Sequence, residues 1–266
     1  MDTGGTFTDL VLFADDTGEL FTWKILSTPH DPSEAVCRGI LELLAQRNLL
    51  PADIAYLGHG TTVATNAFLE GKGAITGLLT TQGFEDLLEI GRQARPHLYD
   101  LHADKHPSLV PGRRRVGIPE RIDFQGQIVT PLDEAAAREA IKKLQRQGTQ
   151  AIAICFLHSW VNPQHERRMQ TLVEEEFPEA YVATSSEVLR EIREYERLST
   201  TVLSAYLGPV VVRYLNRLQQ RLKEIGFRVA PQITQSNGGI MSLQAAERRA
   251  VETALSGPAS GVIGAA

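Results

Sequence analysis

The first residues of the chain have the types and the spacing that suit phosphate chemistry. They read Asp2-Thr3-Gly4-Gly5-Thr6-Phe7-Thr8-Asp9, and an apolar run over residues 10–13 follows at once. Glycines without a Cβ let the backbone turn tightly and bring its N–H groups against an anion, and threonine hydroxyls add donors. The stretch therefore predicts a phosphate-binding turn. An ordinary β-hairpin with a Gly-Gly turn explains the same residues equally well.

Two carboxylates flank this turn. Asp2 is expected at its mouth, where a carboxylate can hold Mg²⁺ or a water molecule beside a nucleotide. Strand side chains alternate, so Thr6 and Thr8 are expected on one face and Asp9 on the other, unless a bulge intervenes. Asp9 therefore stays open between a catalytic role and a carboxylate that accepts bonds from neighbouring backbone.

A second polar group lies between a predicted strand over residues 54–58 and a predicted helix over residues 63–70. It consists of His59, Thr61, Thr62 and Asn66. Ligands of open α/β sheets bind at such strand-to-helix junctions. These residues are predicted to contact substrate or phosphate, and helix capping is the alternative.

Two further pairs are candidates for substrate binding. Arg92 and Gln93 have the groups to grip a carboxylate or a carbonyl, or they form an exposed helix end. Glu196 and Arg197 read equally well as a surface ion pair on a helix, which would add little to stability. Only their place in a longer motif makes the second pair candidates.

The elements that must position these residues alternate in type. Runs over residues 9–14 and 20–26 predict an antiparallel pair, and Asp31, Pro32 and Glu34 predict a helix start with a capping box. Strands and helices then alternate, so residues 9–80 are predicted to form a mixed sheet with helices on its faces. The apolar run over residues 151–157 predicts a strand buried on both faces.

Two stretches depart from this alternation. Residues 91–131 lose periodicity and predict an irregular excursion from the sheet. Residues 189–225 form the longest helical region, and a bend or break is expected near Gly208-Pro209. Its second half carries an apolar stripe that predicts packing on a neighbour.

Composition excludes several classes of function. The chain has 266 residues, a net charge of −5 and two cysteines. This charge gives no general reason to bind nucleic acid or an anionic membrane, and no apolar run is expected to span a bilayer. Two distant cysteines in predicted core segments favour a reducing cytoplasm. Neither a dinucleotide fingerprint nor a P-loop is present, since Gly71-Lys72-Gly73 lacks the spacing and the Ser/Thr.

Six motifs, in this order, resemble the A subunit of the hydantoinase and 5-oxoprolinase family, which includes the β subunits of acetone-type carboxylases. They are DTGGTFTDLV, HGTTVATNAFLEGKGA, GLLTTQGFEDLLEIGRQ with RPHLYDL, ERLSTTVLSAYLGPV, QSNGG and LSGPASGVIGA. They extend over nearly the whole chain. A lone GGT turn has little specificity, whereas the ordered series is highly specific.

The resemblance implies an α/β, ribonuclease-H-like fold of the actin-like ATPase superfamily, related to Hsp70 and sugar kinases. It implies ATP and Mg²⁺, a B-type partner subunit, and ATP-driven attack on a cyclic amide or a small ketone. By resemblance, Gly4, Gly5, Thr6 and Thr8 would line the ATP phosphates, and Asp2 would hold the metal or orient the attacking group.

The resemblance also implies a division of the chain into two regions. The chain differs from the family pattern in two places. Residues 1–184 correspond to the N-terminal domain, including the excursion over residues 91–131, and residues 185–266 to the beginning of a second domain. Family members place an apolar strand before the first aspartate and continue beyond the last motif into a second phosphate loop. The chain is therefore expected to be partial and inactive when isolated.

Three functions remain open from the sequence. The first is a subunit of an ATP-dependent hydrolase that opens a hydantoin or 5-oxoproline ring by phosphorylating the amide oxygen. The second is the β subunit of an acetone- or acetophenone-type carboxylase. The third is a non-catalytic interaction fragment.

Overall fold

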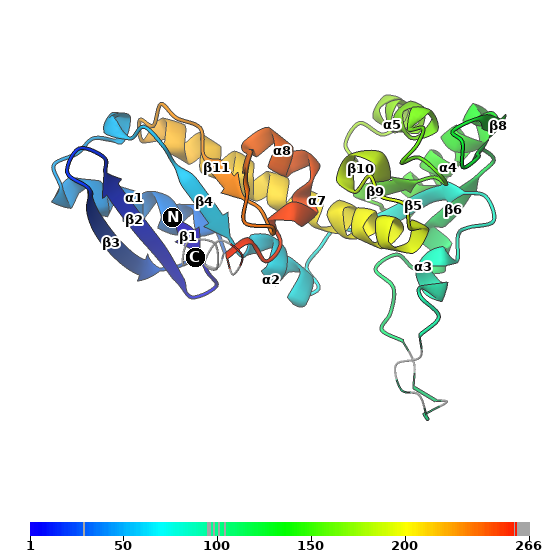
Figure 1. Ribbon diagram of the computed structural model, residues 1–266, viewed down its shortest axis with the longest axis horizontal. Coiled ribbons are helices and arrows are strands. Elements are labelled where there is room, and N and C mark those ends of the chain that lie inside the picture. The colour runs from blue at the N-terminus through cyan, green and yellow to red at the C-terminus, as the bar shows by residue number, and fades with distance from the viewer. Residues whose placement is uncertain are drawn as a thin grey trace. The chain divides into compact units, whose positions relative to one another are not determined.

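The computed structural model describes residues 1–28, 30–94, 97, 99, 100, 102, 103, 105–257 and 259 (Figure 1). Contacts between residues divide the chain into two compact units. The first unit comprises Met1–Gly73 and Val210–Ala266, and the second comprises Ala74–Pro209. The predicted division between residues 184 and 185 concerns family regions along the chain and stays a prediction.

The first unit is built on a six-stranded sheet in the order β12-β11-β4-β1-β2-β3. Its strands are β1 (Asp2–Thr3), β2 (Phe7–Ala14), β3 (Glu19–Leu26), β4 (Gly58–Thr61), β11 (Gln232–Thr234) and β12 (Ile240–Ser242). β1 pairs antiparallel with β2 and parallel with β4, and β2 pairs antiparallel with β3. The predicted antiparallel pair is therefore present, and the opening residues join it as a third strand.

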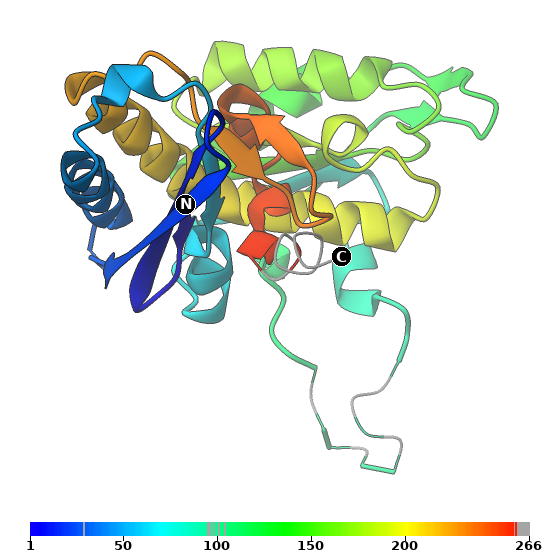
Figure 2. The same cartoon turned by 60° about the vertical axis from the view of Figure 1, so that its left-hand side comes forward.

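Helix α1 (Pro32–Gln46) covers one face of the β2–β3 hairpin (Figure 2). Asp31 caps it by accepting the Ser33 N–H, and Pro32 occupies its first turn, as predicted. The Glu34 side chain instead pairs with Arg221, so the predicted capping box is wrong. A Cβ on Gly39 would lie 2.7 Å from Leu10 Cδ1, and the glycine therefore lets α1 approach the hairpin closely.

The other helices of the first unit are short. They are η1 (Pro51–Asp53), α2 (Val63–Leu69), α8 (Leu243–Arg248) and η3 (Ala250–Thr253). α2 follows β4 directly, as the junction predicted, and the C-terminal part of α7 (Glu194–Glu224) completes the unit.

The second unit has its own parallel sheet, in the order β10-β9-β5-β6. Its strands are β5 (Thr76–Thr81), β6 (Arg115–Ile118), β9 (Ala151–Cys155) and β10 (Tyr181–Thr184). All five residues of β9 are buried between its neighbours, as the apolar run predicted. The prediction of one sheet over residues 9–80 is wrong for β5, because β11 occupies the edge of β4 that β5 would need.

The core of the second unit lies between this sheet and two amphipathic helices, α4 (Glu134–Arg146) and α5 (Gln164–Glu176). Residues 91–131 leave the sheet and return, as predicted, although β6 lies within them. The remaining elements are α3 (Leu87–Ile90), η2 (Gly112–Arg114), β7 (Arg121–Ile122), β8 (Ile128–Thr130) and α6 (Ser185–Val188).

Helix α7 is 31 residues long and continues through Pro209, so the expected interruption is not a break. A Cβ on Gly208 would overlap the Tyr181 ring, so the helix packs closely against Tyr181 at this glycine. Within the described residues, α7 also has the length and apolar composition of a membrane-spanning helix, whereas the sequence analysis expected no such run. Because 61% of its most apolar window is buried in the protein, α7 has the character of a core helix.

Candidate functional site

The turn between β1 and β2 is a tight hairpin fixed from two sides. The Gly4 N–H donates to the Phe7 carbonyl at 2.9 Å, and Ser27 Oγ donates to the Gly4 carbonyl at 2.9 Å. A Cβ on Gly4 would lie 3.1 Å from the Phe7 oxygen, so this position favours glycine. The opening residues therefore form a β-hairpin, as the alternative interpretation predicted. Phosphate binding stays a prediction, and the exposed Gly5 and Thr6 at the tip of the turn leave room for it.

The register of this hairpin sorts the flanking side chains onto two faces. Asp2 is the cross-strand partner of Asp9, and Thr3 is the partner of Thr8. Directly opposed residues of an antiparallel pair share a face, so the two carboxylates lie on one side and the two threonines on the other. Asp9 does turn away from Thr8, as alternation predicted. It pairs with Lys24 at 3.0 Å on an exposed surface.

The Asp2 carboxylate lies close to two glycines, Gly60 and Gly257. A Cβ on Gly60 would be only 2.6 Å from Asp2 Oδ1, and one on Gly257 would be 3.7 Å from both carboxylate oxygens. Partial burial raises the pKa of the Asp2 carboxyl above its usual range, the Met1 ammonium opposes this shift, and the Asp9 charge adds to it. Asp2 and Asp9 are both exposed, and two carboxylates on one accessible face suit a divalent cation.

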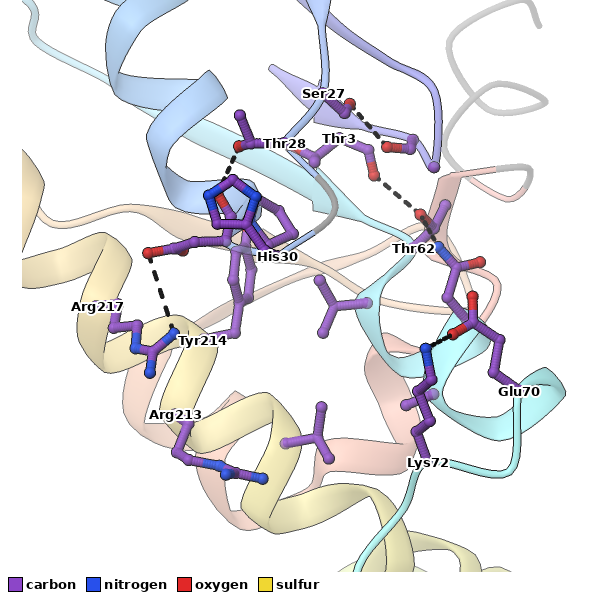
Figure 3. A pocket seen from close by; sticks show the side chains of 18 residues that line it. Thr3, Ser27, Thr28, His30, Thr62, Glu70, Lys72, Arg213, Tyr214 and Arg217 are labelled. Carbon is purple, nitrogen blue, oxygen red and sulfur yellow. Dashed lines mark hydrogen bonds and ion pairs between the residues drawn. The ribbon is translucent and has the colours of Figure 1, made fainter.

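On the threonine face, the turn forms one wall of a cavity of about 370 Å³, the turn pocket (Figure 3). α1, α2 and α7 supply the other walls. Its polar lining includes Thr3, Gly4, Gly5, Ser27, Thr28, His30, Asp31, Thr62, Asn66, Glu70, Lys72, Arg213, Tyr214 and Arg217. The turn and two residues of the second predicted group, Thr62 and Asn66, thus meet at one cavity.

Hydrogen bonds fix these two residues against the turn. Thr62 Oγ1 donates to the Thr3 carbonyl at 3.1 Å, and Asn66 Nδ2 donates to Thr62 Oγ1 at 3.2 Å. A Cβ on Gly5 would meet Asn66 Nδ2 at 3.6 Å, an ordinary contact. Thr62 and Asn66 therefore stabilise the position of the turn and also line the pocket.

His59 and Thr61 belong to the same junction but lie beneath the pocket surface. His59 is fully buried, and its Nε2 lies 2.6 Å from Tyr214 Oη. Burial lowers the pKa of His59 to about 3, so the imidazole is neutral at physiological pH. Thr61 Oγ1 accepts the Val63 N–H at 3.2 Å at the start of α2. Neither residue lines the pocket, which favours the supporting alternative over direct contact.

The remaining candidates belong to the second unit. Arg92 Nε donates to Glu196 Oε1 at 2.8 Å, and Gln93 is exposed beside them with a φ of 57°. Arg92 also lines a cavity of about 640 Å³ together with Tyr195 and Ser199. Arg92 lies in the segment that follows α3 and Glu196 lies on α7, and the two side chains form an ion pair.

Arg197 differs from its neighbour because its side chain is fully buried. Its guanidinium donates to the Phe156 carbonyl at 2.9 Å and to Ser159, Ser185 and Glu194, and it lies 3.8 Å from Glu166. The interpretation of Glu196 and Arg197 as one surface ion pair is therefore wrong. Arg197 has only internal partners among the described residues, and its predicted substrate contact gains no support.

Several pocket residues were not singled out from the sequence. Lys72 was considered only as part of a failed P-loop match. Val210, Arg213, Tyr214 and Arg217 share one face of α7 because they recur at helical spacing, beside the apolar stripe that drew attention. Arg213 and Arg217, four residues apart beside the apolar stripe, were the sequence signal that could have identified this face of α7.

Residues 258 and 260–265 of LSGPASGVIGA and residues 95, 96, 98 and 101 of RPHLYDL lie outside the described residues. Over the residues that the structure does describe, no three His, Cys, Asp or Glu side chains cluster as metal ligands. A cation at Asp2 would therefore complete its coordination with water or phosphate oxygens.

Comparisons with known proteins agree with the series of motifs. Residues 1–177 match the family model of the hydantoinase/oxoprolinase N-terminal region, and residues 197–266 match the hydantoinase/oxoprolinase model. The chain is 41% identical to caprolactamase subunit alpha of Pseudomonas jessenii, over 98% of this chain and 38% of that protein. It is 32% identical to 5-oxoprolinase 1 of Arabidopsis thaliana, over 99% of this chain and 23% of that protein.

Two solved structures share the fold. A nucleotide-free structure of acetone carboxylase superposes with a TM-score of 0.88 at 30% identity, over 99% of this chain and 39% of that one. The crystal structure of the ATP-dependent caprolactamase from Pseudomonas jessenii superposes with a TM-score of 0.86 at 41% identity. The match covers 97% of this chain and 38% of that one. The predicted actin-like ATPase-type α/β fold is thereby confirmed. The chain spans about two fifths of the length of the first of these relatives.

Proposed function

Because the chain belongs to the hydantoinase/oxoprolinase family, we propose that it is the phosphate-binding part of an ATP-dependent hydrolase subunit that opens a cyclic amide. The observation that carries this proposal is the 41% identity to a caprolactamase subunit over 98% of the chain. The protein is an enzyme subunit in this account, active as part of a complete assembly.

The chemistry follows from the resistance of an amide to water. Resonance makes the amide carbon a poor electrophile and the nitrogen a poor leaving group. Transfer of the γ-phosphoryl group of ATP to the amide oxygen forms an O–P bond, breaks the bond to ADP and leaves an activated carbon. Water then adds to that carbon, and loss of inorganic phosphate and of the ring C–N bond gives the ring-opened amino acid.

This reaction asks the protein for positioning and charge stabilisation more than for covalent chemistry. In the proposal, the backbone at Gly4 and Gly5 and the hydroxyls of Thr6 and Thr8 approach the phosphates. Thr8 is the least accessible of them, since it is buried and shares a hydrogen bond with Ser27 at 2.9 Å. Asp2 would hold Mg²⁺, which neutralises charge on the phosphates, and Asp9 would support Asp2 from across the hairpin.

The second candidate function is the carboxylase reaction, in which the same ATP chemistry activates a ketone or bicarbonate. It is favoured by the TM-score of 0.88 to acetone carboxylase. Several relatives are named as subunits, which supports partner subunits, and we propose a B-type subunit among them. The buried free thiols of Cys37 and Cys155 support a cytoplasmic location.

Phosphate release tests these alternatives. The active assembly is supplied with Mg-ATP and, in turn, hydantoins, 5-oxoproline, other lactams and small ketones, each with and without bicarbonate. Release stimulated by a cyclic amide without bicarbonate supports the hydrolase. Release that requires a ketone and bicarbonate replaces it with the carboxylase, and no stimulation by any compound in the assembly contradicts both.

A further inference from the structure

Asn66 is oriented by a chain of hydrogen bonds that ends at the turn. Thr62 Oγ1 carries one hydrogen, which it donates to the Thr3 carbonyl at 3.1 Å (Figure 3). Thr62 Oγ1 can therefore only accept from Asn66, whose Nδ2 lies 3.2 Å away. The chain thus determines which end of the Asn66 carboxamide is the nitrogen and which is the oxygen.

The other polar groups of this carboxamide are available to a ligand. One of the two Nδ2 hydrogens is used on Thr62. Over the residues that the structure describes, the second hydrogen and Oδ1 take part in no hydrogen bond. Asn66 is partly buried and lines the turn pocket of about 370 Å³. The pocket wall therefore presents a donor and an acceptor side by side.

A cyclic amide has the complementary edge. A small ring holds its amide bond in the cis form, so the N–H and the C=O point to the same side. A linear secondary amide has these groups on opposite sides, because its cis form is strongly disfavoured. Only the cyclic amide can therefore accept from Nδ2 and donate to Oδ1 of one carboxamide at the same time.

The turn pocket also has a wall that suits the carbon atoms of a ring. Its apolar lining residues come from α1, α2 and α7 and are Pro32, Val63, Ala67 and Val210. Ring methylene groups would bury apolar surface against these side chains. An apolar wall combined with polar groups at fixed positions is typical of small-molecule sites.

We propose that Asn66 determines the substrate class by pairing with the amide edge of a lactam that keeps its ring N–H. Nδ2 donates to the lactam oxygen, and Oδ1 accepts from the lactam N–H. The substrate is then a cyclic amide with an unsubstituted nitrogen, and lactones, N-alkylated lactams and linear amides are rejected. This inference rests on the proposed function and adds the residue that recognises the amide.

The pairing places the amide oxygen where the proposed reaction needs it. A Cβ on Gly5 would lie 3.6 Å from Asn66 Nδ2, so an oxygen bonded to Nδ2 lies beside the turn. One lone pair of that oxygen accepts from Nδ2, and the other forms the O–P bond while the electron pair of the broken P–O bond leaves with ADP. Positive charge then develops on the lactam nitrogen, which strengthens its N–H bond to Oδ1 in the transition state.

Binding is measured by calorimetry on the active assembly without ATP. The lactam probes are 2-pyrrolidone and caprolactam, each compared with its N-methyl derivative and with the lactone of the same ring size. N-methylacetamide represents linear amides. We expect at least one lactam to bind, its lactone and N-methyl derivative to bind at least about tenfold more weakly, and N-methylacetamide to bind about 50-fold more weakly or less.

Two variants of Asn66 and one matched control complete the test. Asn66→Asp keeps the shape but removes the donor, so lactam binding should weaken at least about tenfold. In Asn66→Ala the preference for a lactam over its lactone should fall to about one, which a merely structural role would not produce. Asn216→Ala makes the same change at an exposed position of α7 that does not line the pocket, and the preference should persist. Thermal melting confirms that the three variants fold.

The inference is overturned if no lactam binds, if a lactone or an N-methyl lactam binds as well as the lactam, or if Asn66→Ala keeps the preference. Phosphate release, measured separately, distinguishes its failure from that of the proposed function. Release stimulated equally by lactams with and without the N–H would remove only the role of Asn66. Lactam binding with the expected preference but without phosphate release would remove the proposed function and keep the binding site.

Discussion

Asp2 and Asp9 stand opposite each other as cross-strand partners, and their carboxylates share the face of the hairpin that lies away from the turn pocket. Asp9 is compensated by Lys24 at 3.0 Å, whereas Asp2 is held against the backbone of Gly60. This asymmetry separates two residues that look equivalent in the sequence. In the proposed function, Asp2 would therefore hold the cation, and Asp9 would be its neighbour.

Gly60→Ala tests whether the position of Asp2 matters. The new methyl would lie 2.6 Å from Asp2 Oδ1 and 3.3 Å from Thr234 Oγ1, so the carboxylate must move. We expect the free energy of unfolding to fall by about 1–3 kcal/mol and ATP turnover by the assembly to fall by about tenfold or more. Urea unfolding and phosphate release measure the two effects.

Gly112→Ala is the matched control, because a Cβ there meets no atom within 4 Å. It should change the unfolding free energy by less than about 0.5 kcal/mol and leave turnover unaltered. If Gly60→Ala behaves in the same way as this control, Asp2 does not need its observed position.

Arg197→Met tests the structural role of the buried arginine. The change removes donors to Phe156, Ser159 and Ser185 and leaves Glu166 without its nearest cation. Breaking one partner of a buried ion pair costs about 3–5 kcal/mol, so a loss of that order is expected in urea unfolding. Arg167→Gln, an exposed arginine of α5, should cost less than about 0.5 kcal/mol.

A different result would restore Arg197 as a substrate residue. Near-normal stability combined with a large rise in the KM for the cyclic amide would show that the side chain acts on the ligand rather than on the core.

His59 predicts a specific dependence of stability on pH. Its pKa is lowered to about 3 in the folded protein by burial, whereas an unfolded histidine titrates near its ordinary value of 6.5. Between these values the unfolded chain binds more protons, so this residue stabilises the fold fully above about pH 6.5 and progressively less as the pH falls. Between pH 7 and pH 5 the loss should be about 2 kcal/mol.

Urea unfolding of the wild type and of His59→Gln at the two pH values isolates this contribution, since carboxylates titrate in both proteins. The variant should lose less stability than the wild type on acidification. Equal losses would show that His59 is accessible to protons in the folded state.

The sequence predicted those features that local patterns determine. Alternation revealed the β2–β3 pair, the Asp31-Pro32 start located α1, and the apolar run identified β9 as a buried strand. Features that depend on distant partners were beyond it. The assignment of β5 to a separate sheet depends on β11, which is far along the chain.

The candidate site shows the same division. The turn and the strand-to-helix junction were found from their residue types, and Thr62 and Asn66 do meet the turn. The shared face of Asp2 and Asp9 depends on hairpin register, and the burial of Arg197 depends on partners in β9, α5 and α6 or beside them. Arg213 and Arg217 join the pocket only because α7 passes it, which no local pattern indicates.

The most direct test of the account is Asp2→Asn in the active assembly, with Mg-ATP affinity and turnover measured in parallel. The change removes the charge for the cation but leaves the Gly4-Gly5 backbone in place. We predict that affinity stays within about threefold while turnover falls by about 10²-fold or more, because that charge acts chiefly on the transition state. Unchanged turnover in Asp2→Asn would contradict the assignment of this hairpin as the ATP site.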